Sequence, residues 1–218
     1  MANTCFNDIT FYSTDEAKIK KLHSDFEKNS DNFIALYTVI KNMGYDYLNK
    51  VVVDRRDAFT YLGEIVKGGL DDEPIYNFEI CTESANAPNM QMLKALIEEE
   101  PYKGIELVHM SEEDGCGLYI NTDTAGLFYD ARYFITSALN EEYDRYSSKD
   151  FASIVERAMS DFPEADISED DTIDEIESKI EPFLNEDDYY NIYEYRKTYS
   201  ECTLLEDMAT KAMFKKTA

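Results

Sequence analysis

The stretch CFNDITFYSTDEAKIKKLHSDF, residues 5–26, decides the fold of this chain because its periodicity changes half-way along. Its first eight residues alternate sides in the manner of a β-strand, which places Ile9 and Phe11 on one face. Ser13 and Glu16 have the spacing of a capping box and predict that a helix follows. Apolar side chains then recur at helical spacing: Ile19, Leu22 and Phe26. The chain is therefore expected to open with a strand that leads into a helix.

Segments of both kinds continue downstream. The pattern predicts helices over residues 31–43 and 89–99, and strands over residues 51–53, 61–66, 75–81, 105–110, 118–120 and 127–129. Gly68, Gly69 and Pro74 supply turn chemistry between two of these strands. Mixed order with hairpins predicts an α+β fold with a mostly antiparallel sheet and helices over one face.

The character of the sequence changes near Asn140, after which it is acidic and has helical periodicity. The apolar stripes are Phe151, Ile154, Val155 and Met159, and then Ile173, Ile176, Ile180 and Phe183. Thr172 and Glu175 form a second capping-box pattern, and residues 189–213 are predicted to form a last helix. We therefore expect an α+β domain over residues 1–138 and an acidic helical extension over residues 139–218.

The charge of the chain limits its partners. Its 46 Asp and Glu residues outnumber 21 Lys and Arg residues, and the formal net charge is -25. Phosphate groups are neutralised by clustered Lys and Arg, so this composition argues against direct binding to DNA, RNA or an anionic membrane. A strongly acidic protein associates instead with basic surfaces, and we expect such a partner.

Cysteine spacing and hydropathy indicate the compartment. The four cysteines are scattered without a C-x-x-C motif, and neither histidine lies near them at zinc-ligand spacing. The N-terminus lacks the apolar segment of a signal peptide, and no apolar run reaches the ~20 residues of a membrane span. We expect a cytoplasmic protein with reduced thiols, no cofactor and no contact with a membrane.

Two short motifs carry a resemblance. MANTC at residues 1–5 and SEEDGCGLYINTD at residues 111–123, followed by Phe128–Tyr129 and Arg132–Tyr133, resemble the uncharacterised ferredoxin-like domain family of plasmid and phage proteins that includes YubB. The chain departs from the family pattern at Asn86, where many members carry Trp. The resemblance covers roughly residues 1–138, and it implies a ferredoxin-like sandwich encoded by a mobile element. It assigns no catalytic residue.

One segment partly matches a calcium-binding loop. Asp166, Ser168, Asp170, Thr172, Asp174 and Glu177 fall at positions 1, 3, 5, 7, 9 and 12 of a twelve-residue loop. Position 6, where the sharp turn requires Gly, is Asp171. The alternative is an acidic loop that leads into a capped helix, and we predict no metal at this segment.

A second acidic group suggests chemistry. Glu112, Glu113 and Asp114 lie at a predicted strand end, with Glu83 as a potential neighbour. Paired carboxylates perform acid–base or metal chemistry, so a metal-dependent enzyme is one alternative function. Solvated acids also collect at turns between strands, and we predict no catalytic residue here.

The run from Asp161 to Asp188 holds thirteen carboxylates and one base, Lys179. Helical spacing would set these carboxylates in rows that resemble the phosphates of duplex DNA. The predicted partner-binding residues are Asp161, Glu164, Asp166, Glu169, Asp170, Asp171, Asp174, Glu175, Glu177, Glu186, Asp187 and Asp188, with Tyr189, Tyr190, Tyr193 and Tyr195 as aromatic anchors.

These residues lead to a hypothesis of function. The chain is expected to be a non-enzymatic binder that occludes a basic, nucleic-acid-binding surface of a host protein, such as a CRISPR effector. The second alternative, beside the enzyme, is a structural or cargo protein of a phage particle, in which acidity assists packing beside basic partners.

Overall fold

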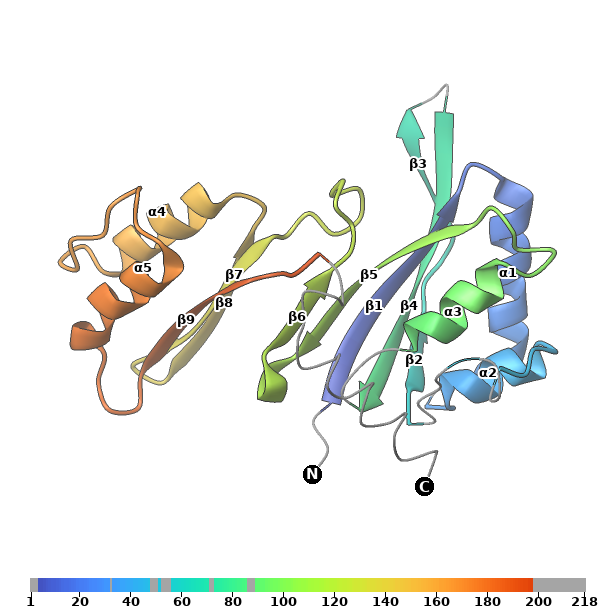
Figure 1. The fold of residues 1–218 in the computed structure, drawn as a ribbon, viewed down its shortest axis with the longest axis horizontal. Coiled ribbons are helices and arrows are strands. Elements are labelled where there is room, and N and C mark those ends of the chain that lie inside the picture. The colour runs from blue at the N-terminus through green and yellow to red at the C-terminus, as the bar shows by residue number, and fades with distance from the viewer. Residues whose placement is uncertain are drawn as a thin grey trace. The chain divides into compact units, whose positions relative to one another are not determined.

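The computed structural model describes residues 4–31, 33–47, 51, 56–70, 73–85 and 89–197. The chain forms two compact units, which we call the first and the second unit, and the change between them falls after Thr122. Figure 1 labels the elements of both. The boundary expected from the sequence, between residues 138 and 139, falls at the end of β7 (Tyr133–Leu139).

The first unit combines an antiparallel sheet with helices. Its elements are β1 (Thr4–Ser13), α1 (Glu16–Asn29), α2 (Leu36–Asn42), β2 (Ala58–Leu62), β3 (Val66–Leu70), β4 (Glu73–Ala85), α3 (Met90–Ile97), β5 (Glu106–Glu113), a 3-10 turn (Asp114–Cys116) and β6 (Leu118–Asn121). The strand order is β2-β4-β1-β5-β6, with β3 paired to β4, and every pairing is antiparallel. Figure 1 shows α1, α2 and α3 on one side of this sheet. The predicted α+β class with a mostly antiparallel sheet is confirmed.

Strand β1 lies in the middle of this sheet, and its predicted alternation is confirmed by alternating burial. The ring of Phe11, which faces the helices, lies 5.8 Å from the ring of Phe26 in α1 and 5.3 Å from that of Phe78 in β4. Helix α1 begins after Asp15, whose carboxylate accepts the first free N–H groups, and not after Ser13 as predicted. The apolar side of β1 thus organises the larger core.

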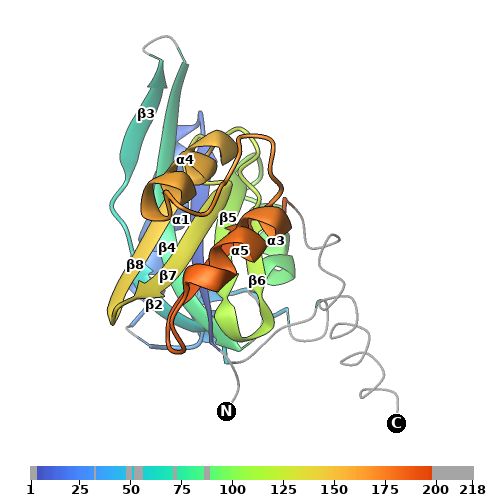
Figure 2. The ribbon, with the colours of Figure 1, turned by 90° about the vertical axis from the view of Figure 1, so that its left-hand side faces the viewer.

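The second unit has three strands and two helices. Its elements are β7 (Tyr133–Leu139), β8 (Glu142–Ser148), α4 (Phe151–Asp161), α5 (Ile173–Ile180), a 3-10 turn (Glu181–Phe183) and β9 (Tyr189–Glu194). The strand order is β8-β7-β9, again antiparallel. Figure 2 shows α4 and α5 in front of the sheet. Ile154, Val155, Ile176 and Ile180 of these helices pack with Ile135 and Ile192 of the sheet in a separate core.

The second unit opens with a loop that folds around Asp123. The buried carboxylate of Asp123 accepts the N–H groups of Gly126 at 2.9 Å, Phe128 at 2.6 Å and Tyr129 at 2.9 Å. Burial alone would raise the pKa of Asp123, but these backbone hydrogen bonds outweigh it and hold the pKa below its ordinary value. Nη1 of Arg132 donates to the carbonyl of Tyr129 at 3.3 Å. Asp123 is the last residue of the second motif on which the family resemblance depends, and its role here is structural.

The expectation that the chain is helical after residue 139 is wrong for two segments. β8 pairs with β7 over seven residues, and β9 pairs with the other edge of β7 over six. Most side chains of the edge strand β8 are exposed. Its sequence therefore lacks the alternation of apolar and polar residues from which a strand is predicted. The expected last helix over residues 189–213 begins as strand β9, and its part from residue 198 lies outside the described residues.

The two predicted apolar stripes are largely confirmed as the inner faces of α4 and α5. Met159 and Phe183, the last residue of each predicted stripe, are exposed. The capping box of Thr172 and Glu175 is confirmed, with both of its hydrogen bonds present. Among the described helices, none is both long and apolar enough to cross a membrane.

Candidate functional site

Most of the acid run lies in loops. Of the thirteen carboxylates in residues 161–188, three belong to α5 and eight belong to two loops, residues 162–172 and 184–188. The prediction that these carboxylates form rows along a helix face is therefore wrong. Helix α5 has only eight residues, and it turns Ile176 and Ile180 into the core, so it has room for few exposed acids.

Lys179, the one base in the run, is held by the loop that precedes α5. Its Nζ donates to the carboxylate of Asp171 at 2.6 Å and to the backbone carbonyl of Asp166 at 3.0 Å. The same carboxylate accepts the N–H of Ser168 at 2.7 Å. These hydrogen bonds hold the pKa of Asp171 below its ordinary value, and the bond with Lys179 has the largest effect. The loop is thus tied to the helix by a cation that the chain supplies itself.

Two further carboxylates fix the start of α5 and the C-terminal end of the acidic segment. The carboxylate of Glu175 accepts the N–H of Thr172 at 2.8 Å, and that of Asp188 accepts the N–H of Asn140 at 2.9 Å. Asp188 also accepts the side-chain amide of Asn185 at 2.6 Å. Hydrogen bonds to the charged form lower the pKa of both carboxyl groups. Both side chains therefore stabilise local structure.

Two carboxylates link the helices to the sheet. Asp161, at the end of α4, accepts Nε of Arg157 at 2.8 Å and the hydroxyl of Tyr190 in β9 at 3.2 Å. Oε1 of Glu177 in α5 accepts the N–H of Ile192 in β9 at 2.7 Å. Burial raises the pKa of Glu177, although this hydrogen bond opposes the shift. We call Asp161, Asp171, Glu175, Glu177 and Asp188 the anchor carboxylates.

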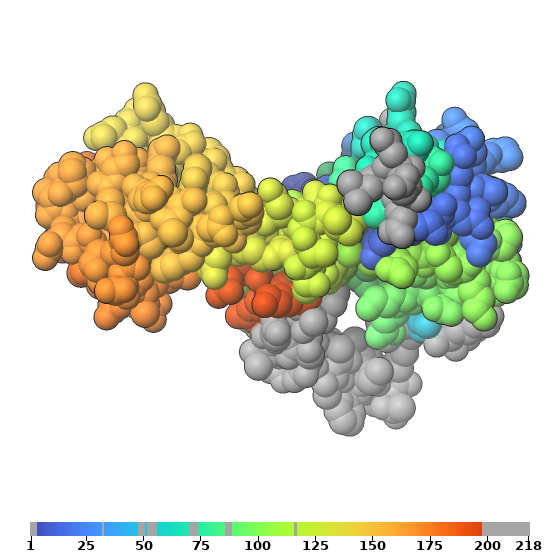
Figure 3. All heavy atoms as spheres, turned by 90° about the horizontal axis from the view of Figure 1, so that it is seen from above, coloured from blue at the N-terminus to red at the C-terminus, as the bar shows by residue number. Residues whose placement is uncertain are grey.

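The remaining carboxylates of the run are exposed. They are Glu164, Asp166, Glu169, Asp170, Asp174, Glu181, Glu186 and Asp187. Among the described residues, no hydrogen bond or ion pair reaches the carboxylate of any of these eight. We call them the exposed carboxylates, and part of the surface from α4 to α5 that carries many of them is visible in Figure 3 (orange). The predicted partner-binding residues thus divide into side chains that hold the segment and side chains that face solvent.

The four tyrosines predicted as aromatic anchors occupy different environments. Tyr190 and Tyr195 are buried, so their prediction as interface anchors is wrong. Tyr190 packs edge-on against Phe162, with 5.2 Å between ring centroids, and Tyr193 stacks on Phe134 at 4.9 Å. Tyr189 remains exposed and available to a partner. The alternation of β9 places successive tyrosines on opposite faces of the sheet, which a helical interpretation cannot anticipate.

The segment that resembles a calcium loop does not have the geometry of one. Glu177, at the position that would bind calcium with both oxygens, is turned toward β9 by its bond to Ile192. Thr172 caps α5, and Lys179 already contributes a positive charge to the loop. Within the described residues, the carboxylates of Asp166, Asp170, Asp174 and Glu177 do not converge in a group of three close donor atoms.

Glu177 allows a prediction about the fold of the acidic segment. We expect Glu177→Gln to leave the free energy of unfolding unchanged within about 0.5 kcal/mol, because an amide oxygen accepts the same N–H without a buried charge. Glu177→Ala leaves the N–H of Ile192 without its acceptor and should cost about 1–2 kcal/mol. Urea unfolding at neutral pH measures both.

The pH dependence distinguishes this explanation from a general loss of packing. Folding raises the pKa of Glu177 above the ordinary value of about 4.3. The free energy of unfolding therefore falls as the pH rises from about 4.3 through the pKa of the folded state. Glu177→Gln should remove that part of the pH dependence. Equal destabilisation by Gln and Ala would contradict the assignment of Glu177 as an acceptor of the Ile192 N–H.

The cluster proposed for an enzyme is divided by the sheet. Glu112 and Glu113 are consecutive residues of β5, so their side chains point to opposite faces. Glu113 is buried, whereas Asp114 is exposed at the following turn. Glu83 and Glu112 pair with Phe6 from opposite sides, which places β1 between them. These four acids do not converge as paired carboxylates.

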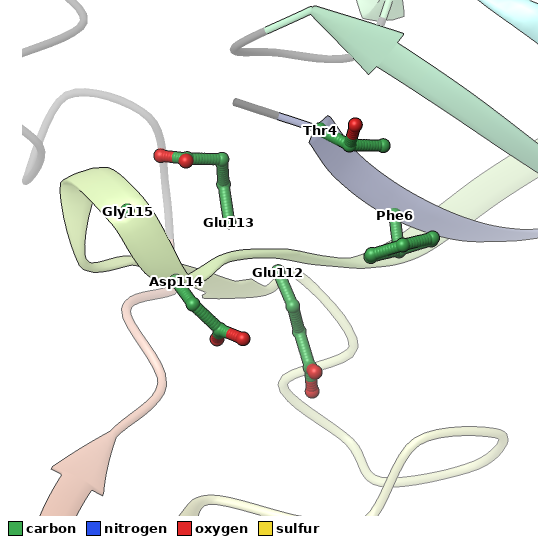
Figure 4. A pocket seen from close by; sticks show the side chains of 6 residues that line it. All are labelled: Thr4, Phe6, Glu112, Glu113, Asp114 and Gly115. Atoms are coloured by element: carbon green, nitrogen blue, oxygen red, sulfur yellow. The ribbon is translucent and has the colours of Figure 1, made fainter. Parts of the chain in front are cut away.

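A pocket of about 280 Å³ lies at this end of the first unit. It is lined by Thr4, Phe6, Glu112, Glu113, Asp114 and Gly115. Figure 4 shows the side chain of Glu113 directed away from those of Glu112 and Asp114. The carboxylate of Asp114 accepts the hydroxyl of Tyr119 at 3.0 Å. Three carboxylates therefore line the pocket, and that of Glu113 points away from the other two.

Sequence reasoning missed a buried polar cluster on the helix-facing side of the first sheet. It contains Cys5, Asn7, Thr82, Ser84, His109, Ser111 and Glu113. Nδ2 of Asn7 donates to the hydroxyl of Thr82 at 3.2 Å and to that of Ser84 at 3.0 Å, so the cluster links β1 to β4. The signal in the sequence was the alternation itself, which placed Cys5 and Asn7 on the same face as apolar residues.

Burial holds two members of this cluster, His109 and Cys5, in their neutral forms. Burial, with the positive charge of Lys94, lowers the pKa of His109 to about 3. Burial raises the pKa of Cys5 to about 12, and the charges of Glu113 and Asp57 contribute in the same direction. A neutral imidazole and a protonated thiol do not form an activated nucleophile, and Nδ1 of His109 is engaged with Ser111 at 2.9 Å.

Comparison with family models, curated proteins and solved structures finds no match to this chain. The acidic surface of the second unit is the best candidate for a functional site. Eight of its carboxylates form no hydrogen bond or ion pair with the described residues, so the fold does not explain their presence.

Proposed function

We propose that the second unit is a binding module whose exposed carboxylates engage a basic surface of another protein. The observation that carries this proposal is the division of the acid run into anchor and exposed carboxylates. Asp171 holds the first loop to Lys179 of α5, and Asp188 holds the second loop to Asn140. Glu177 holds α5 to β9. The exposed carboxylates are consequently carried on ordered backbone rather than on a solvated tail.

Electrostatics favours this function. Residues 123–197 contain 21 Asp and Glu residues against seven Lys and Arg residues. Crowded carboxylates repel one another, and a basic partner relieves that repulsion on binding. Negative charge on an ordered surface also steers a positive partner during encounter and can raise association rates by about 10- to 1,000-fold.

The partner that fits best is a nucleic-acid-binding protein. Its binding groove is basic because it neutralises closely spaced phosphates, and an acidic protein surface competes for the same charges. The resemblance of the first 138 residues to a family from mobile elements directs this proposal to a host defence complex, with a CRISPR effector as the specific candidate. The module would act by occlusion and without chemistry.

We further propose that the first unit has a ferredoxin-like topology. Support comes from its connections: β1 and β2 are joined through α1 and lie on either side of β4, and β5 pairs with the other edge of β1 after α3. This is a split βαβ arrangement in which α2, β3 and β6 are additions. The resemblance noted in the sequence implies the same topology.

Capture from a host lysate tests the binding function. The tagged chain should retain a basic protein at about 50 mM salt and release most of it at about 200 mM, because opposite charges are screened and counterions compete. Duplex DNA added at low salt should displace the same protein. Retention that resists both salt and DNA would reject occlusion of a nucleic-acid-binding surface.

A further inference from the structure

A group of three donor side chains lies on the face of the first sheet that points away from the helices. Asp8 in β1 is directly opposite Cys81 in β4, and Glu79 lies two residues before Cys81 on the same strand. Side chains of paired residues and of every second residue share a face, so all three point the same way. All three are half-buried.

The donor atoms have the spacing of a metal site. One carboxylate oxygen of Asp8, one of Glu79 and Sγ of Cys81 all lie within 4.8 Å of one another. Sγ of Cys81 lies 3.8 Å from Oε1 of Glu79. With Zn–S near 2.3 Å and Zn–O near 2.1 Å, the edge between a sulfur and an oxygen ligand of a tetrahedral site is about 3.6 Å. Small rotamer adjustments therefore suffice to bring the atoms to ligand positions.

The backbone positions of these ligands are fixed before any metal binds. β1 and β4 pair over ten consecutive residues without a register shift, and β1 pairs with β5 on its other edge. Ligands on adjacent strands of a central sheet keep their separation without loop ordering. Little conformational entropy is therefore lost when a cation binds.

The charge around the group also favours a cation. β1, β2, β4, β5 and β6 contain no Lys or Arg, and the one base of β3, Lys67, is paired with Tyr76. Burial raises the pKa of the Cys81 thiol, and the carboxylates of Asp8 and Glu79 raise it further. A divalent ion that replaces the thiol proton would turn repulsion among these groups into attraction.

We propose that Asp8, Glu79 and Cys81 form a binding site for a thiophilic divalent cation, of which Zn²⁺ is the best match. The thiolate selects against Mg²⁺ and Ca²⁺, which prefer oxygen ligands. Three protein ligands leave a fourth tetrahedral position for water or another donor. The site lies in the first unit and is independent of the binding function proposed for the second.

Cobalt substitution tests this site in the chain of 218 residues. One equivalent of Co²⁺ should produce the near-ultraviolet charge-transfer absorption of a Co²⁺–thiolate bond, and Zn²⁺ should displace it. Cys81→Ser should abolish that absorption while Cys5, Cys116 and Cys202 remain in place. Asp8→Asn should weaken Zn²⁺ binding by at least about tenfold in calorimetric titration, the lower limit seen when a metal site loses a supporting group.

Glu112→Gln is the matched control, because Glu112 lies on the same face of β5 but outside the donor group. It removes one carboxylate and should leave Zn²⁺ affinity unchanged. Circular dichroism reports whether each variant folds. If Cys81→Ser does not fold, the native Co²⁺ spectrum and Asp8→Asn decide. Absence of the thiolate absorption, its persistence in Cys81→Ser, or equal weakening by Glu112→Gln would each overturn the proposal.

Discussion

Reversing the charge of four exposed carboxylates, Glu169, Asp170, Asp174 and Glu186, should lower the association rate with the captured partner by about 10- to 100-fold. Glu169, Asp170 and Glu186 lie in loops, and Asp174 lies in the first turn of α5. Reversal of Asp174 should cost about 1 kcal/mol at most, so the variant is expected to remain folded at the temperature of the assay. The loss is expected in the association rate because long-range attraction acts during encounter. Surface plasmon resonance at two salt concentrations measures it, and the difference from the native chain should shrink at the higher one.

A matched variant separates a local array from net charge. Glu27, Asp31, Glu64 and Glu100 are exposed acids of the first unit, and their reversal to Lys changes the net charge by the same amount. This control should retain most of the native association rate. Equal loss in both variants would mean that total charge, and not the surface of the second unit, attracts the partner.

The structure changes which residues such an experiment can use. From the sequence alone, Asp170, Asp171, Asp174 and Glu177 were equivalent members of one acid run. The structure places Asp171 on Lys179 and Glu177 on the N–H of Ile192, so reversing either would disturb the loop or the contact between α5 and β9. Their partners are 8 and 15 residues away along the chain, beyond what helical spacing can reveal.

Several elements of the N-terminal part were predictable because they carry strong periodic signals. The strands predicted over residues 61–66 and 127–129 are wrong, because β2 ends at Leu62, β3 begins at Val66, and residues 127–129 lie in the loop that follows Asp123. β1 alternates over its length, and α1 and α3 have apolar stripes. β8 and β9 gave no such signal. β8 is an exposed edge strand rich in charge, and β9 has three tyrosines among its six residues with a single aliphatic residue, so neither strand shows a regular apolar alternation. Pairing between distant segments decided these elements.

The same limit applies to the two polar groups of the first unit. The donor group of Asp8, Glu79 and Cys81 joins residues about seventy positions apart, and only the register of β1 with β4 brings them together. The strand that contains Glu79 and Cys81 was predicted over residues 75–81, and the strand that contains Asp8 was predicted as well. The sequence did not show that these two strands pair or in which register. Spacing rules for metal ligands recognise local motifs, and this arrangement is not local.

Replacing Asp123 by Ala should lower the free energy of unfolding of the second unit by about 2–4 kcal/mol. The substitution removes a buried carboxylate and leaves the N–H groups of Gly126, Phe128 and Tyr129 without their acceptor. Charge-assisted hydrogen bonds are about twice as strong as neutral ones, so Asp123→Asn should be destabilising by a smaller amount. Urea unfolding followed by far-ultraviolet circular dichroism measures both variants.

The pH dependence of that loss tests its cause. Folding lowers the pKa of Asp123, so its charge stabilises the protein fully above the ordinary value of about 3.9, and the contribution disappears as the pH falls through the lower folded value. The difference between the native chain and Asp123→Ala should therefore be largest at neutral pH and smaller near pH 3. A difference that stays constant would show that the side chain acts by filling space. The loop of residues 123–132 leads directly into β7, the central strand of the second sheet. Loss of the Asp123 carboxylate should therefore also destabilise the sheet and helices of the second unit, which carry the exposed carboxylates.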